Sequence, residues 1–253
     1  MRRRQRLVQF PAQAPQGIVR PAIRGGRRPG CRQTPRLRAG DRPEPSMAGA
    51  MNPLQAKLRK AVRRTWMKYA MRGVGGADNY ERLDMAYRLG DPWNMESRLE
   101  QSRFEATNAL IERAFGRVGS LLEVGCGEGH QTLALRRIAD EVCGIDVSAT
   151  AVERAQVRAP DARFSACDIH GQPWGDERHR FDLVVACEVL YYIKDIPATI
   201  KRMNHLGRAC FVTFFAPALV RVDPHLQGIE GLHKDWMQHD GQTWLVCWWR
   251  NPE

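Results

Sequence analysis

The 253-residue sequence contains seven cysteines but no pair of them in the C-x-x-C spacing that thiolate metal sites commonly use. It also has no apolar stretch long enough to span a bilayer, no secretory signal pattern and no internal repeat. These absences argue against a cysteine-ligated metal centre, a transmembrane anchor and a repeat architecture. An odd number of cysteines without a secretory signal favours a reducing compartment, so we expect a cytoplasmic protein that needs no metal.

Acidic residues are scarce in the first 72 positions. Residues 1–46 contain twelve Arg against Asp41 and Glu44, and residues 47–72 add seven Lys or Arg and no acid. The formal net charge of +11 therefore arises from a first part that carries +17, while the remainder from Gly73 onward carries −6. A groove that tracks phosphates needs a basic surface on the folded core, so nucleic-acid binding by this core is not expected.

Residues 1–46 are rich in Arg, Pro and Gly and show almost no apolar periodicity. Such a composition cannot bury enough surface to offset the entropy cost of ordering, so we predict a disordered extension. An alternative is that translation begins at Met47 or Met51. We expect residues 47–115 to form a helical segment that caps a site, and residues 116–253 to form the domain that carries it.

The basic stretch at residues 53–72 predicts an amphipathic helix. Its apolar residues recur at helical spacing on one face, as Leu54, Leu58, Val62, Trp66 and Tyr69. In one interpretation this stripe packs on the core and the charges are solvated. In the other, the helix makes a weak peripheral contact with an anionic membrane surface.

A glycine-rich turn follows the first predicted strand, where residues 121–132 read LLEVGCGEGHQT. Gly125, Gly127 and Gly129 allow the backbone to turn sharply and approach a ligand before a helix begins. A dinucleotide fingerprint, G-x-G-x-x-G, would place its third glycine at the position of His130. The turn therefore predicts a nucleoside-cofactor site that binds no pyrophosphate. A plain strand-to-helix connection is the alternative.

Further acids fall where other predicted strands end. Asp146 ends EVCGID, Asp168 and Ile169 end ARFSACDI, and Glu188 interrupts the apolar run at 181–193 that predicts a central strand. Ligands of open α/β sheets lie beyond the carboxyl ends of the strands, so we expect these acids to meet at one crevice. Taken singly, Asp146 could cap a helix and Asp168 could form a turn.

The remaining pattern completes an α/β fold, with a helix at 196–206, a strand at 209–217 and two strands around the Asp240-Gly241 turn. We predict a Rossmann-like, doubly wound sheet of seven strands, mostly parallel, with a C-terminal antiparallel hairpin and helices on both faces. The tryptophans of the hairpin either pack it on a helix or flank a sugar site; they are Trp236, Trp244, Trp248 and Trp249.

The G-x-G-x-G turn with Glu123 before it resembles motif I of class I S-adenosylmethionine-dependent methyltransferases. Residues 89–110 read LGDPWNMESRLEQSRFEATNAL, and this DPW with its E-x-x-R-F helix, together with EVLYYI at 188–193, resembles the nodulation protein S-type methyltransferases. The resemblance is good over about residues 84–206. It implies S-adenosyl-L-methionine as the cofactor, S-adenosyl-L-homocysteine as the product, and N- or O-methylation of a small-molecule or glycan acceptor. No N/D-P-P-Y or Pro-Cys motif is present, which argues against adenine, glutamine-amide and cytosine C5 methylation.

The resemblance also implies the site residues. At the end of the first strand and in the turn after it, the cofactor would contact Glu123, Gly125, Cys126, Gly127, Gly129 and His130. Asp146 and Val147 would contact its ribose, and Asp168 and Ile169 its adenine. Trp93 and Arg103 would cap the site. Arg103 would hold the carboxylate of the cofactor. Its alternative is an i,i+3 ion pair with Glu100, and the alternative for Trp93 is a core aromatic.

Three residues lie nearest in sequence to the expected reaction space: Glu188, Tyr191 and Tyr192. We predict that Glu188 accepts a proton, unless it orients the cofactor or bonds a neighbouring loop, and that one of the tyrosines positions the acceptor. The alternative is that one tyrosine is buried in the hydrophobic core and the other packs on the cofactor. A cofactor-binding protein without turnover, and an RNA methyltransferase tethered by the basic N-terminus, are the alternative functions. No oligomeric state is predicted.

Overall fold

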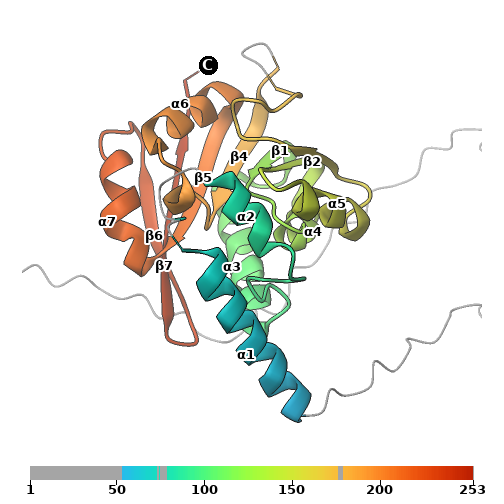
Figure 1. Ribbon diagram of the computed structural model, residues 1–253. Coiled ribbons are helices and arrows are strands. Elements are labelled where there is room, and N and C mark those ends of the chain that lie inside the picture. Colours follow the sequence, from blue (N-terminus) through green and yellow to red (C-terminus); the bar gives the residue numbers. More distant parts are fainter. Residues whose placement is uncertain (1–52, 73, 75–78, 176–178, 253) are drawn as a thin grey trace, which may run out of the picture. The chain divides into compact units, whose positions relative to one another are not determined.

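The computed structural model describes residues 53–72, 74, 79–175 and 179–252 (Figure 1). The predicted extension at 1–46 and the alternative start positions Met47 and Met51 lie outside the described residues. The chain divides into two compact units, residues 1–56 and 57–253, and the sheet belongs to the second. No helix among the described residues is long and apolar enough to cross a membrane.

The second unit is built on one seven-stranded sheet in the order β3-β2-β1-β4-β5-β7-β6. The strands are β1 (Val118–Val124), β2 (Ala139–Asp146), β3 (Arg163–Ala166), β4 (Phe181–Cys187), β5 (Gly207–Phe215), β6 (His233–His239) and β7 (Gln242–Arg250). The first five pair in parallel, and β7 pairs antiparallel with β5 and β6. The order reverses direction at β1, so the carboxyl ends of β1 and β4 flank a crevice. The predicted sheet is confirmed.

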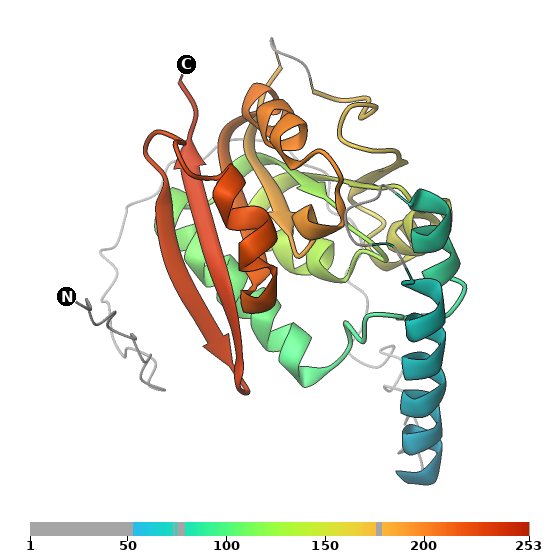
Figure 2. The same ribbon diagram turned by 60° about the vertical axis from the view of Figure 1, so that its left-hand side comes forward.

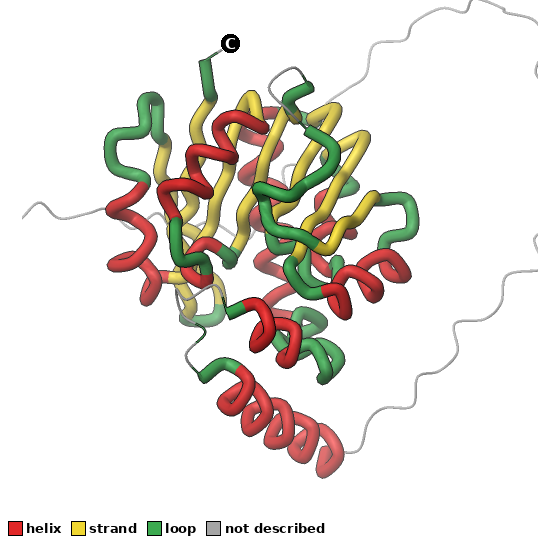
Figure 3. The backbone as a smooth tube through the Cα atoms, turned by 45° about the horizontal axis from the view of Figure 1, so that its top comes forward, coloured by secondary structure: helices red, strands yellow, loops and turns green. Residues whose placement is uncertain are grey.

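Helices cover both faces of the sheet (Figure 3). Side chains alternate along each strand, so Leu121 packs with α3 (Arg98–Phe115) and α4 (His130–Leu135), while Leu122 packs with α6 (Ile196–Leu206) and α7 (Leu219–Val222). Another helix, α5 (Ala149–Arg158), follows β2; Ser148 caps it by accepting a hydrogen bond from the Ala151 N–H at 3.1 Å. Two apolar layers therefore hold the strand ends in place, as a doubly wound fold requires.

Two strands are shorter than the sequence predicts. The apolar run at 181–193 does not continue as one strand, because Glu188 adopts a left-handed backbone with φ of 58° and a 3₁₀ turn follows at Leu190–Tyr192. A non-glycine residue in this region is uncommon and marks a locally enforced conformation. Similarly, β3 ends at Ala166, so Asp168 and Ile169 lie in the loop beyond it.

The C-terminal hairpin lies at the edge of the sheet (Figure 2). Its two-residue turn uses Asp240 and Gly241, both with positive φ, as the sequence predicts. Trp244 and Trp249 are buried in the core. These two therefore pack as one interpretation predicts, whereas Trp236 is 42% exposed. No tryptophan of the hairpin lines the cavity described below.

The basic helix α1 (Pro53–Ala70) forms, but its apolar stripe does not pack on the core. Leu58, Val62 and Tyr69 are 64%, 51% and 52% exposed. Only Trp66 of these turns inward, and its indole N–H donates to the Ala86 carbonyl at 3.1 Å. Helical periodicity identified the stripe but does not specify which face of the helix packs on the rest of the second unit.

Candidate cofactor-binding and active site

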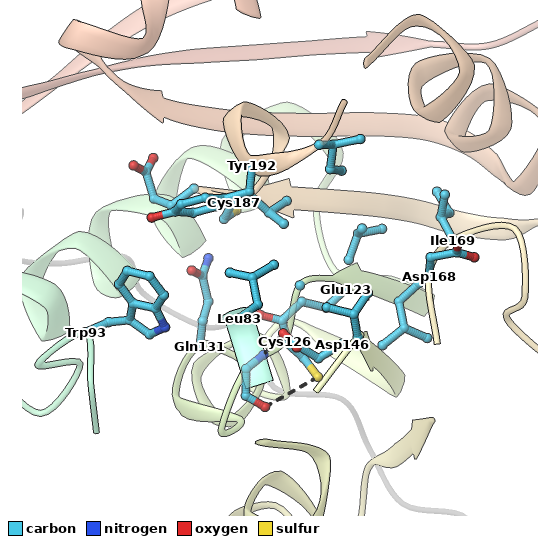
Figure 4. Close-up of a pocket in the computed structure, with 18 of the residues that line it drawn as sticks. Leu83, Trp93, Glu123, Cys126, Gln131, Asp146, Asp168, Ile169, Cys187 and Tyr192 are labelled. Carbon is cyan, nitrogen blue, oxygen red and sulfur yellow. Dashed lines mark hydrogen bonds between the residues drawn. The ribbon is translucent and has the colours of Figure 1, made fainter. Parts of the chain in front are cut away.

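A cavity of about 300 Å³ opens at the carboxyl ends of β1, β2, β3 and β4 (Figure 4). All the predicted site residues line it except Gly129. Gly129 turns the chain with φ of 78°, and a Cβ there would meet the Ala155 Cα of α5 at 3.0 Å. Gly129 thus allows the turn to pack closely on α5, and its predicted contact with the cofactor stays a prediction.

The glycine turn forms the floor of this cavity. Gly125 and Gly127 have φ of 74° and 52°, a region that favours glycine. A Cβ on Gly127 would lie 2.8 Å from the Tyr87 hydroxyl oxygen, so Tyr87 can approach only because the side chain is absent. Cys126, between the two glycines, is buried with its Sγ 3.7 Å from the Gly127 carbonyl oxygen, and burial raises the pKa of its thiol well above the ordinary value. Cys126 therefore contributes an uncharged thiol to the floor of the cavity.

Asp146 ends β2 and is held by the backbone on both sides. Its two carboxylate oxygens accept the Gly127 and Ser148 N–H groups, each at 2.9 Å. Burial raises its pKa to about 6, against the lowering effect of these hydrogen bonds. The Ser148 hydroxyl donates onward to Asp84 of α2 (Tyr80–Ala86) at 2.5 Å. Ser148, not Asp146, caps α5, so the capping alternative for Asp146 is wrong, and its carboxylate lines the cavity.

Asp168 and Ile169 lie at the opposite end of the cavity from Trp93 (Figure 4). One Asp168 oxygen accepts the N–H groups of His170 and Gly171 at 3.0 and 2.9 Å, so this residue does form the turn that its alternative predicted. Ile169 is buried and supplies an apolar surface. An acid beside an apolar wall is a suitable surface for a heteroaromatic ring that carries an amino group.

Arg103 is buried, and its guanidinium is engaged at two of its edges. Its Nε donates to Glu100 at 2.7 Å, which confirms the i,i+3 pair, and its Nη1 donates to Gln131 Oε1 at 3.1 Å. The amide Nε2 of Gln131 is buried and has no hydrogen-bond partner among the described residues. A buried donor without a partner costs free energy, so this corner of the cavity is suited to an anionic ligand group.

Glu123 is buried beneath the turn at the end of β1. It accepts the Thr132 hydroxyl at 2.5 Å. Burial raises its pKa to about 8, although the Thr132 hydrogen bond and Arg103 oppose the shift. Glu123 is therefore largely neutral at neutral pH, and its role is to fix the start of α4.

Glu128 is a site residue that the sequence analysis missed. It is buried, pairs with Arg154 at 2.5 Å and accepts the Asp91 N–H at 3.0 Å, which ties the turn to the segment before α3. Burial acts to raise its pKa, but the nearby His130, whose Nε2 lies 3.5 Å from the carboxylate, and the bonded Arg154 outweigh burial and lower it. Asp91, Glu128 and His130 have ligand atoms within 4.8 Å of one another, but Asp91 also caps its own loop by accepting the Met95 N–H at 2.5 Å.

An aromatic wall lies at the β4 end of the cavity. The Trp93 and Tyr192 rings are 5.6 Å apart, the Tyr191 and Tyr192 rings 4.5 Å, and the Tyr191 and Phe215 rings 5.2 Å. Trp93 is half-buried and points into the cavity (Figure 4), unlike a core aromatic. Burial raises the pKa of Tyr191 well above its ordinary value and that of Tyr192 to about 12, so both hydroxyls stay protonated near neutral pH.

Glu188 lies at the edge of this wall and accepts hydrogen bonds from three groups. They are the Thr213 hydroxyl at 3.0 Å, the Phe215 N–H at 3.2 Å and the Tyr191 hydroxyl at 3.3 Å. Burial raises its pKa above the ordinary carboxyl value, and Arg103 opposes the shift. Glu188 therefore bonds the neighbouring strand β5, where one alternative expected a loop, and presents a carboxyl with raised proton affinity to the cavity.

Part of the cap of the cavity comes from residues that no sequence motif marks. Leu83 and Tyr87, in and just after α2, and Met95 after the DPW motif all line it. Local sequence patterns can assign these residues to a helix or a loop, but they cannot show that the residues lie over the glycine turn. Of the cap, only Trp93 and Arg103 carried a family resemblance.

The sequence profile of the nodulation protein S (NodS) family matches residues 76–210, more than half of the chain and all the predicted site residues. The chain belongs to the nodulation protein S family. Nodulation protein S of Bradyrhizobium diazoefficiens is 32% identical over 123 residues, which are 47% of this chain and 57% of that protein. The chain spans between 52% and 63% of the curated nodulation protein S sequences that it matches here.

A solved nodulation protein S structure extends the likeness to three dimensions. The N-methyltransferase NodS from Bradyrhizobium japonicum WM9, in complex with S-adenosyl-L-homocysteine, matches with a TM-score of 0.59 and 26% identity over 70% of this chain and 100% of that one. A ubiquinone biosynthesis O-methyltransferase of Rhodopseudomonas palustris is 37% identical over 84 residues, 32% of this chain and 33% of that protein. The predicted family and fold are thus confirmed.

Proposed function

We propose that the chain is an S-adenosylmethionine-dependent N-methyltransferase whose acceptor is the amine of an amino sugar or oligosaccharide. The observation that carries this proposal is the convergence of four strand ends on one cavity, with an acid at or just beyond each. Nodulation protein S membership and the likeness to an N-methyltransferase structure support the reaction class.

The donor set of the cavity fits the cofactor. Asp146 presents a carboxylate to the ribose hydroxyls, and Asp168 with Ile169 presents an acid and an apolar surface to the adenine. The buried Gln131 amide, whose carbonyl oxygen accepts from Arg103, has an Nε2 without a partner among the described residues and donates to the amino-acid carboxylate. When bound, S-adenosylmethionine supplies a methyl group on a positively charged sulfur.

The residues at the β4 end act on the acceptor. Amine methylation needs an unprotonated nitrogen, which loses a proton in the course of the reaction. Glu188 receives this proton, since its raised pKa brings its proton affinity closer to that of the amine. The Tyr191 hydroxyl fixes the carboxyl of Glu188, and the rings of Trp93 and Tyr192 exclude water and hold the acceptor in line.

An aromatic wall beside a carboxyl group supports a sugar amine as the acceptor. The apolar faces of pyranose rings stack on aromatic side chains, and a carboxyl binds the amino group. O-methylation of a hydroxyl group is the second candidate, because the match to the ubiquinone biosynthesis O-methyltransferase favours it.

Binding of the cofactor is tested first by calorimetric titration with S-adenosylmethionine, S-adenosylhomocysteine and NAD. We expect the first two to bind and NAD not to. Asp146→Ala should lose binding by about 100-fold or more, since two charge-assisted hydrogen bonds to hydroxyls disappear. The matched control is Asp161→Ala, whose side chain is 70% exposed and pairs with Arg136. Tighter binding of NAD would overturn the proposal.

The acceptor is tested by formation of S-adenosylhomocysteine with glucosamine oligomers, their N-acetylated counterparts and a catechol. Turnover with only the free amines supports the proposal. Turnover with only the catechol favours O-methylation. Cofactor binding without turnover on any acceptor would favour the binding-protein alternative, and activity on RNA that is lost without residues 1–72 would favour the tethered RNA enzyme.

A further inference from the structure

The exposed face of α1 combines apolar and basic side chains. Leu58, Val62 and Tyr69 follow one another at spacings of four and seven residues, which places them on one face of the helix. All three are more than half exposed. A soluble helix usually buries such a stripe, so an exposed one on a folded unit indicates a binding surface.

The charge around this stripe has one sign. Seven Lys or Arg and no acid occur between residues 57 and 72, and six of the seven are exposed. At 100° per residue, Lys57, Arg64 and Lys68 lie along one flank of the stripe, and Arg59 lies on the other. A helix with an apolar stripe between basic flanks is suited to the interface of a bilayer that contains anionic lipids.

The inner face of the same helix is tied to the cap of the cavity. Trp66 donates to the Ala86 carbonyl at the end of α2, and Arg82 of α2 donates to the Tyr69 carbonyl at 3.0 Å. Leu83 of α2 lines the cavity. A surface that binds α1 would therefore also hold the cap of the site near it.

We propose that the face of α1 formed by Leu58, Val62 and Tyr69 docks on an anionic lipid bilayer and holds the cap of the cavity at the membrane surface. This inference goes beyond the proposed function and does not depend on it. The apolar side chains insert among the lipid headgroups, and the basic flanks contact the headgroup phosphates.

The test is co-sedimentation of the full chain with vesicles of phosphatidylcholine and phosphatidylglycerol. We expect Leu58→Ser/Val62→Ser to lower the partition coefficient by about tenfold or more, because apolar insertion is lost while every charge remains. The matched control is Val157→Ser/Val220→Ser, since these two side chains are 83% and 89% exposed elsewhere in the same unit. The control should bind as the wild type does, and thermal midpoints should show that both variants are folded.

Two further measurements separate the bilayer from other partners. Vesicles of phosphatidylcholine alone should bind about tenfold less protein, since the electrostatic attraction is missing. Binding to heparin should not change in Leu58→Ser/Val62→Ser. Vesicle binding that is equal in wild type and this variant would overturn the proposal and attribute the binding to the arginine-rich residues 1–46. An equal loss of heparin and vesicle binding would also overturn it, in favour of a polyanionic partner.

Discussion

Replacement of Glu123 by Gln should change how stability depends on pH. Glu123 is 3% exposed at the end of a central strand and accepts the Thr132 hydroxyl. Burial raises its pKa from 4.5, the ordinary value for an exposed glutamate, to about 8. Gln has almost the shape of the protonated carboxyl group and can accept the same hydrogen bond, so the variant mimics the wild type with its proton bound.

Proton linkage gives the direction in which the free energy of unfolding changes with pH. Between about pH 5 and pH 8 the folded wild type holds a proton on Glu123 that the unfolded chain has released. Its free energy of unfolding should therefore fall by about 1.4 kcal/mol per pH unit relative to the Gln variant, which has no such proton. The free energy of unfolding of the wild type, relative to that of the variant, should fall by about 3 kcal/mol between about pH 5.5 and about pH 7.5. It should level off above about pH 8.

Urea unfolding of both proteins at several pH values measures this difference directly. Glu141→Gln is the matched control, because Glu141 lies on the neighbouring strand β2 with its side chain 71% exposed. The control should differ from the wild type by the same amount at every pH. A wild type and a Glu123→Gln variant whose stabilities run parallel from about pH 5.5 to about pH 8.5 would refute the reasoning, since Glu123 would then be ionised throughout.

Three other substitutions test the site. Gly127→Ala should lower stability by about 1–3 kcal/mol and weaken S-adenosylhomocysteine binding about tenfold or more, because of the positive φ and the 2.8 Å approach to the Tyr87 hydroxyl; unchanged titration and urea curves would contradict this. Glu188→Gln should keep cofactor affinity but lower kcat about 100-fold or more. In the wild type, kcat should fall at low pH with an apparent pKa above the ordinary carboxyl value, since burial raises the pKa of Glu188. This fall should be absent in the variant, and a fall that persists would exclude Glu188 as the proton acceptor. Ser148→Ala removes the cap to Ala151 and the bond to Asp84, and should cost about 1–3 kcal/mol in urea unfolding. A loss below about 0.5 kcal/mol would show that water replaces both bonds.

The sequence alone determined the order of elements and the strand-end acids, because these depend on local patterns. The apolar runs before Gly125 and Asp146 and the Asp240-Gly241 turn each signal their structure within a few residues. In a parallel sheet the carboxyl ends meet at one edge, so the convergence of Asp146, Asp168 and Glu188 on one cavity followed from that pattern.

Only the tertiary structure decided which side chains complete the site. Tyr87 lies over Gly127, and Glu128 joins Asp91 to Arg154, through contacts between segments 26 to 40 residues apart in the chain. No local spacing encodes such contacts. The turn at Glu188 depends likewise on its bonds to Thr213 and Phe215 of the neighbouring strand.

The same distinction explains α1. Periodicity located its apolar stripe correctly, but a stripe specifies a face and not what covers that face. Trp66 and Tyr69 contact α2, while Leu58 and Val62 stay exposed. Whether an apolar residue is buried depends on the position of the rest of the fold, and that position is set by long-range packing rather than by the sequence of the helix itself.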